Sequence, residues 1–188
     1  MESSPPAAEA IVALLGLRPL PREGGFYAET FRGEPLSADG SGGSGGPAGS
    51  EAADERVIKT AIYYLMTPHA FSALHRLPSP ELFHFYLGDP VEQLLLFPDG
   101  TGRLVRLGDD LLAGERPQSL VPGGVWQGAR LAPGGRTGYS LLGTTMAPGF
   151  AFSSYEHGER GALLAAYPAF AAGIVGLTRS EADAADEV

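Results

Sequence analysis

The sequence predicts an all-β protein, a sandwich or barrel, with a short helix near each end. From Arg56 onward, short runs of β-forming residues alternate with turns that contain Pro, Gly or Asp, a spacing typical of sheets that limit their exposed edges. Leu94, Leu95 and Leu96 are consecutive. Both faces of that strand are therefore expected to be covered, which favours two packed sheets over one open sheet.

The elements follow one another in a simple order. Ile11, Leu14 and Leu15 stand at helical spacing before Gly16, which predicts a short helix within residues 7–17. A strand is expected over residues 26–32, after a turn at Glu23. Further strands are expected over residues 57–66, 71–77, 82–87, 91–97, 102–107, 119–121, 125–131 and 139–146. Apolar spacing over residues 163–177, interrupted by Pro168, predicts helices that cover one outer face of the barrel.

The length of 188 residues suits a single domain, residues 1–188, with a core over about 10–178. Between residues 37 and 50, six of fourteen residues are Gly and four are Ser. Such a composition buries too little apolar surface to offset the entropy of ordering. We expect a flexible insertion there, not a domain boundary.

The net charge of the chain limits the classes of molecule that it is expected to bind. Thirteen basic and twenty-two acidic side chains give a net charge of −9, which disfavours nucleic acid and anionic membranes and favours a small-molecule partner. The chain has no Cys, so thiolate chemistry is not available to it. The first apolar run, residues 11–17, is too short for a membrane span and has no basic residue before it, so a cytoplasmic location is expected.

The most informative motif runs from His75 to Gly88, with six residues between Glu81 and the Gly. It resembles the first motif of the cupin superfamily. The segment from Pro122 to Gln127 resembles the second cupin motif, with Gln127 at the position of its His. Together with the segments at residues 21–27 and 147–150, these motifs are similar to those of the cupin family called domain of unknown function 985.

The resemblance implies a cupin double-stranded β-helix, a jelly-roll barrel that encloses a small-molecule pocket and often forms a homodimer. Metal-binding cupins use two His two residues apart, the Glu and the second-motif His, a set suited to divalent ions. Here His75 and Glu81 occupy two of these positions, whereas Leu77 and Gln127 occupy the others. We therefore assign no cofactor; a divalent metal, if one is bound, would use His75, Glu81 and Gln127.

The resemblance to the sugar-nucleotide epimerase branch of the cupins suggests chemistry without a metal. His75 would be a general base that removes a proton next to a carbonyl group, since an imidazole ordinarily titrates near neutral pH. Glu81 would orient it, and Tyr139 or Tyr64 would supply the opposing proton. The same residues also suit structural roles: His75 as a hydrogen-bonded core residue, and Glu81 as an exposed residue at a strand start.

The expected pocket has further members. Phe83 and Phe85 share the strand parity of Glu81 and would form an apolar wall, while Gln127, Tyr64 and Glu23 would contact the ligand. Three functions remain open: a metal-independent epimerase or isomerase of a carbohydrate-like or carbonyl compound, a non-catalytic ligand-binding cupin, and a metal-dependent cupin enzyme. His69 and His157 are expected in solvated loops, and His84 on the outer sheet face.

Overall fold

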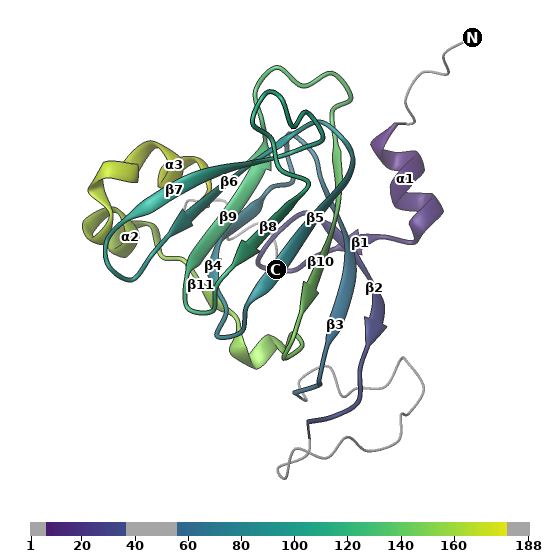
Figure 1. Cartoon of the computed structure of the whole chain (residues 1–188), viewed down its shortest axis with the longest axis horizontal. Helices are drawn as coiled ribbons and strands as arrows, with labels where there is room; N and C mark the ends of the chain where they lie inside the picture. Colours follow the sequence, from purple (N-terminus) through teal and green to yellow (C-terminus); the bar gives the residue numbers. More distant parts are fainter. Residues whose placement is uncertain (1–6, 37–55, 180–188) are drawn as a thin grey trace.

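Two antiparallel β-sheets pack face to face in the computed structural model, which describes residues 7–36 and 56–179 (Figure 1). The first sheet contains, in spatial order, β1 (Arg18–Pro19), β2 (Phe26–Arg32), β3 (Thr60–Met66), β10 (Ser140–Met146), β5 (Glu81–Gly88) and β8 (Gln118–Val121). The second contains β11 (Glu156–His157), β4 (Ser72–Arg76), β9 (Trp126–Leu131), β6 (Val91–Leu96) and β7 (Gly102–Leu107). The predicted all-β jelly roll is confirmed. The Gly/Ser-rich segment 37–50 lies outside the described residues.

The core between the sheets is apolar along most of its length. Tyr64, Phe83 and Leu142 from the first sheet pack with Val91 and Leu95 from the second. On β6, Leu94 and Leu96 point the opposite way from Leu95. Helices cover that outer face, so the prediction that both faces of this strand are covered is confirmed.

The C-terminal segment supplies that cover. It consists of α2 (Arg160–Ala166), the 3₁₀ turn η2 (Pro168–Phe170) and α3 (Ala171–Gly176) (Figure 1). The Glu159 carboxylate accepts hydrogen bonds from the first backbone N–H groups of α2. Leu163 and Ile174 then pack on the outer leucines of β6.

A single helix near the N-terminus, α1 (Ala8–Leu15), packs on the outer face of the first sheet. It buries Ile11 against Leu65 of β3 and Leu141 of β10. Gly16 ends the helix in the left-handed conformation, at a φ of 62°, as its place in the sequence predicts. Among the residues that the structure describes, no helix has the length and apolar character needed to cross a membrane.

Candidate functional site

Six polar side chains meet between the two sheets and form what we call the His75 cluster. Its members are His75 and Ser72 on β4, Gln127 on β9, Tyr64 on β3, Glu81 on β5, and Glu23 in the turn between β1 and β2. All six are buried. Buried polar groups need partners, so their hydrogen bonds define what the cluster can do.

The pairing of β4 with β9 arranges two members of the cluster. His75 stands directly opposite Gln127 in the ladder, so their side chains project from the same face of the second sheet. The register shifts between Ser72 and His75. Residues three apart on a regular strand face opposite ways, but this irregularity lets both side chains reach Glu23. The sequence carries no clear signal for such a bulge.

The hydrogen bonds of His75 determine its tautomer. Its Nδ1 lies 2.8 Å from the Ala73 carbonyl oxygen, and a carbonyl only accepts, so Nδ1 carries the proton. In the neutral ring the lone pair is therefore on Nε2. This atom is buried and has no hydrogen-bond partner in the part of the chain that the structure describes. Among the described residues, the carboxylate paired with it is that of Glu23, whose Oε2 lies 3.8 Å away.

Glu23 is held in place by the turn in which it lies. The Ser72 hydroxyl donates to Glu23 Oε1 at 2.9 Å, and Ala73 N–H donates to the Glu23 backbone carbonyl. Gly24 has a φ of +96°, and a Cβ on it would lie 2.5 Å from both the Phe71 carbonyl oxygen and an Arg179 nitrogen. Only glycine fits this close approach. The turn thus places Glu23 beside His75, whereas contact of Glu23 with a ligand stays a prediction.

Glu81 and Gln127 link the two sheets across the interior. Gln127 Nε2 donates to Glu81 Oε2 at 2.6 Å. Behind it, Ser119 Oγ donates to Gln93 Oε1 at 2.6 Å, and Gln93 Nε2 lies 3.5 Å from Gln127 Oε1. This chain of amides turns the N–H₂ of Gln127 toward the carboxyl group.

Burial raises the pKa of the Glu81 carboxyl, and the nearby Glu23 carboxylate raises it further. His75 and the hydrogen bonds from Thr144 and Gln127 oppose that rise, but the net pKa shift is upward. Glu81 therefore holds a proton at higher pH than an ordinary carboxyl group. Glu81 does not orient His75 in the predicted way. The His75 Nδ1 bonds to the Ala73 carbonyl, and Glu23 is the carboxylate beside Nε2.

Tyr64 completes the inner wall of the cluster. Its hydroxyl donates to the Gly24 carbonyl at 2.8 Å, so it ties β3 to the turn that carries Glu23. Burial raises the pKa of this hydroxyl well above its usual value, and the Glu23 carboxylate raises it further. Tyr64 is thus a hydroxyl donor already committed to the backbone.

Tyr155, which the sequence analysis did not single out, covers His75. It follows the 3₁₀ turn η1 (Phe152–Ser154), and its ring stacks on the imidazole with centroids 5.2 Å apart and an angle of 19°. The Arg22 guanidinium lies over the Tyr155 ring at 5.2 Å. No motif marks Tyr155, because it reaches the site from the segment between β10 and β11.

The two predicted wall residues lie beside the cluster, but Tyr139 does not. Phe83 is buried in the inter-sheet core, and Phe85 packs against that core. Tyr139 lies on the outer face of the first sheet, packed with Ile11 and Leu141 beneath α1. It shares the parity of Leu141, whereas Leu142 points inward. The prediction of Tyr139 as a proton donor at the site is therefore wrong in its geometry.

The other histidines lie outside the cluster. His69 is exposed in the turn between β3 and β4. His84 contacts Gln118 and Thr145 on the outer face of the first sheet, as its parity predicts. His157 is exposed on β11, opposite His75 in the ladder, and its Nδ1 lies 3.2 Å from the Tyr155 hydroxyl.

The donor set does not fit a divalent metal. In the described ranges, no group of three His, Cys, Asp or Glu side chains is arranged to hold one. Gln127 presents its N–H₂ group to Glu81, and an amide nitrogen is not a metal ligand. Leu77 packs with Met146 and Tyr155 in a small apolar cluster. The arrangement suits proton transfer or hydrogen bonding better than coordination.

Comparisons with known proteins place this geometry in a family. Residues 9–158 match the family model described as Cupin superfamily (DUF985). The uncharacterized protein YML079W of Saccharomyces cerevisiae is 30% identical over 136 residues, which cover 71% of this chain and 67% of the yeast protein.

Two solved structures are similar over nearly the whole chain. A hypothetical protein from Leishmania major has a TM-score of 0.78 at 30% identity, covering 93% of this chain and 100% of the other. Protein SO0799 from Shewanella oneidensis has a TM-score of 0.77 at 33% identity, covering 94% and 100%. The chain therefore belongs to the cupin superfamily, in its DUF985 family, and has the small-molecule-binding fold of the cupins.

Proposed function

We propose that this cupin binds a small carbonyl or carbohydrate-like molecule and moves a proton on the carbon next to its carbonyl group, without a metal, as an isomerase or epimerase. The observation that carries the proposal is the buried His75 Nε2, whose lone pair has no hydrogen-bond partner among the described residues. An unsatisfied buried acceptor is costly, and a catalytic role is one reason for a native protein to keep one.

His75 would act as the base through Nε2. The Nδ1 proton stays on the Ala73 carbonyl and fixes the ring, so only Nε2 is able to accept a proton from a ligand. The imidazolium that forms would face Glu23 Oε2 at 3.8 Å. Ser72 holds the other oxygen of Glu23, so this carboxylate is oriented to stabilise the charge that proton transfer creates.

Glu81 would return a proton to the ligand. Its raised pKa keeps its proton available, and Gln127 holds one of its oxygens. A base and an acid whose environments differ in this way are typical of sites that remove a proton and return it. Tyr64 would position the turn, and Phe83 and Phe85 would contact apolar parts of the ligand.

Access to His75 passes Tyr155. The imidazole is only 1% exposed, and the Tyr155 ring stacks on it. A ligand therefore reaches Nε2 only after the Tyr155 ring or the Glu23 side chain moves. The Glu23 side chain, at 12% exposed, is more accessible than the imidazole beside it.

Solvent deuterium exchange tests the proposal without knowledge of the product. Wild-type protein in D₂O is incubated with a panel of hydroxy aldehydes, hydroxy ketones and ketose sugars, and NMR follows deuterium at the carbon next to the carbonyl group. We expect His75→Asn to lower the exchange rate at least about a hundredfold, the usual contribution of a general base. His84→Asn, a change on the outer face, should leave the rate unaltered.

Two outcomes separate the alternatives. Exchange that is equally fast in His75→Asn would contradict the role of His75 as the base. Ligand binding without exchange in the wild type would favour the non-catalytic ligand-binding cupin. The homodimer that the family resemblance implies and the cytoplasmic location stay predictions; light scattering and cell fractionation would test them.

A further inference from the structure

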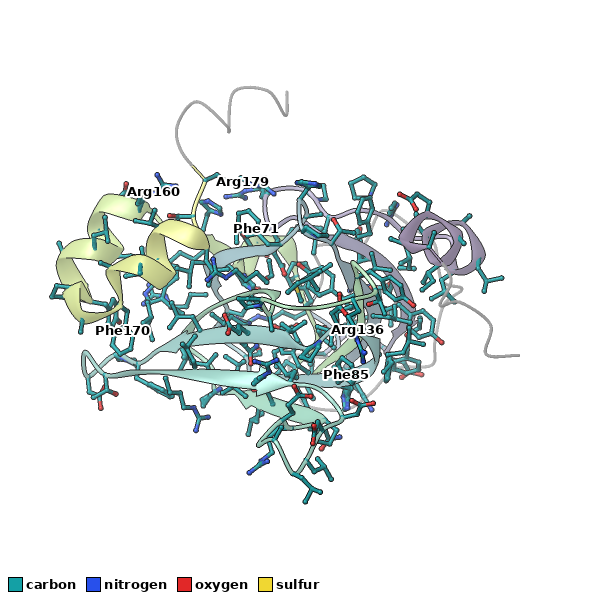
Figure 2. All side chains as sticks on the ribbon, turned by 90° about the horizontal axis from the view of Figure 1, so that it is seen from above. Phe71, Phe85, Arg136, Arg160, Phe170 and Arg179 are labelled. Atoms are coloured by element: carbon teal, nitrogen blue, oxygen red, sulfur yellow. The ribbon has the colours of Figure 1, made fainter. Side chains whose placement is uncertain are left out.

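Positive charge gathers around Tyr155, on the outer side of the His75 cluster. Arg22 is exposed, with its guanidinium over the Tyr155 ring. Arg179 follows α3 and lies over Phe71 at 6.0 Å, against Gly24 (Figure 2). Both guanidinium groups influence the pKa values of Tyr155 and His157. Burial and the Glu23 carboxylate raise the pKa of the Tyr155 hydroxyl, whereas Arg22 and Arg179 lower it. Burial lowers the pKa of His157, and the two arginines lower it further.

The backbone of Arg22 is held in an unusual conformation. Its φ is +66°, and it is the sole residue other than glycine with a positive φ in the described ranges. For a residue with a Cβ this conformation costs roughly 1–2 kcal/mol, whereas a glycine would adopt it freely. None of the ion pairs formed by the described residues includes Arg22. The strained position therefore presents a cation that has no carboxylate partner within residues 7–36 and 56–179, which points to a function for the side chain.

The overall charge of the protein does not account for the presence of Arg22 and Arg179 near Tyr155. The chain has a net charge of −9, with 13 basic side chains in all. Two of these come from distant parts of the chain to the same tyrosine, which itself covers the candidate base. Guanidinium groups bind carboxylates and phosphates through paired N–H donors.

We propose that Arg22 and Arg179 bind an anionic group, a carboxylate or a phosphate, of the molecule whose reactive end reaches His75. This inference deepens the proposed function and rests on it for the identity of the reactive end. Glu23 sets the orientation, since its carboxylate beside Nε2 repels an anion from the base. The anionic end of the ligand then lies on the Arg22 side of Tyr155, and the uncharged carbonyl end lies on the His75 side.

NMR titration with simple anions tests this site directly. The ring resonances of His157 and the Nε–H resonances of the arginines are followed as inorganic phosphate, acetate or uncharged glycerol is added at constant ionic strength. We expect saturable shifts with phosphate or acetate and none with glycerol. The anion that binds more tightly identifies the chemical source of the charge.

Variants make the test specific. Arg22→Gln and Arg179→Gln should each weaken anion binding about tenfold, as expected for the loss of one charge-assisted contact. Arg18→Gln is the matched control, because Arg18 is an exposed arginine that lies over Tyr27 at 5.0 Å. Arg22→Gly should fold at least as stably as the wild type, since it removes the strain, and still lose anion binding. Equal affinities in Arg22→Gly and Arg18→Gln, or no saturable shift in the wild type, would overturn the inference.

His75→Asn distinguishes failure of this inference from failure of the proposed function. It should keep anion binding within about twofold, because the anion does not contact His75, while it loses deuterium exchange. Anion binding that depends on Arg22, with exchange unaffected by His75→Asn, would contradict the proposed function alone. Exchange that depends on His75, without anion binding in the wild type, would contradict the anion site alone.

Discussion

Replacing Gln127 with Met removes the donor that crosses the interior to Glu81 while keeping an unbranched side chain of similar length. In the wild type, Gln127 Nε2 donates to Glu81 Oε2 at 2.6 Å, and both residues are buried. A hydrogen bond to a charged group contributes about 1.5–3 kcal/mol to stability. The contact between Gln93 and Gln127 is at 3.5 Å and adds little.

The expected cost of Gln127→Met is therefore about 2 kcal/mol where Glu81 is ionised, which lowers the Tm of a chain of this length by roughly 4–8 °C. The folded-state pKa of Glu81 is raised, and losing the donor raises it further. A carboxyl with a raised folded pKa stabilises the fold fully below its unfolded pKa and loses that contribution as the pH rises through the folded pKa. The difference between variant and wild type should thus be small near pH 4 and grow toward pH 8.

Urea unfolding at several pH values measures this difference. Gln118→Met is the matched control, because the Gln118 amide contacts His84 on the exposed face and its loss should cost less than about 0.5 kcal/mol at any pH. The reasoning would be refuted if Gln127→Met destabilised the protein equally at pH 4 and pH 8. A loss below about 0.5 kcal/mol at pH 8 would also refute it, since the bond would then contribute no more than an exposed one.

Two further changes probe the same interior. Glu81→Gln cannot ionise, so its stability relative to the wild type should rise as the pH rises from 4 to 8; a flat difference in urea unfolding would show that Glu81 carries no raised folded pKa. Tyr64→Phe removes the buried bond to the Gly24 carbonyl and should cost about 1–2 kcal/mol, whereas Tyr139→Phe, which loses no hydrogen bond within the described residues, should cost less than about 0.5 kcal/mol by thermal unfolding. Equal costs for the two tyrosines would contradict the placement of Tyr64.

Local sequence patterns predicted most of the fold. Strand β2 matches the expected range of residues 26–32, and the other expected strands agree within a few residues. Leu94 and Leu96 pack under α2 and α3, as three consecutive leucines indicated. These features succeed because strand alternation and turn chemistry act over a few neighbouring residues.

The sequence predicted site residues correctly only where strand alternation fixes the face on which a side chain lies. His75, Glu81 and Gln127 face the interior as expected. For Tyr139 the sequence does not indicate which face of the sheet its side chain joins. Three features depend on contacts between distant segments: the register shift between Ser72 and His75, the stacking of Tyr155 on His75, and the electrostatic effect of Arg22 and Arg179 on Tyr155. Single-sequence periodicity contains no information on such contacts.

The tautomer of His75 is the most direct test of the account, because the proposed chemistry needs a lone pair on Nε2. Long-range ¹H–¹⁵N correlation NMR of the protein labelled in its histidines, with His75→Asn to assign the signal, distinguishes the two ring nitrogens. The account predicts that in the neutral ring Nδ1 is protonated, toward the Ala73 carbonyl, and Nε2 is not. A neutral ring with its proton on Nε2 would contradict both the geometry of the His75 cluster and the assignment of His75 as the base.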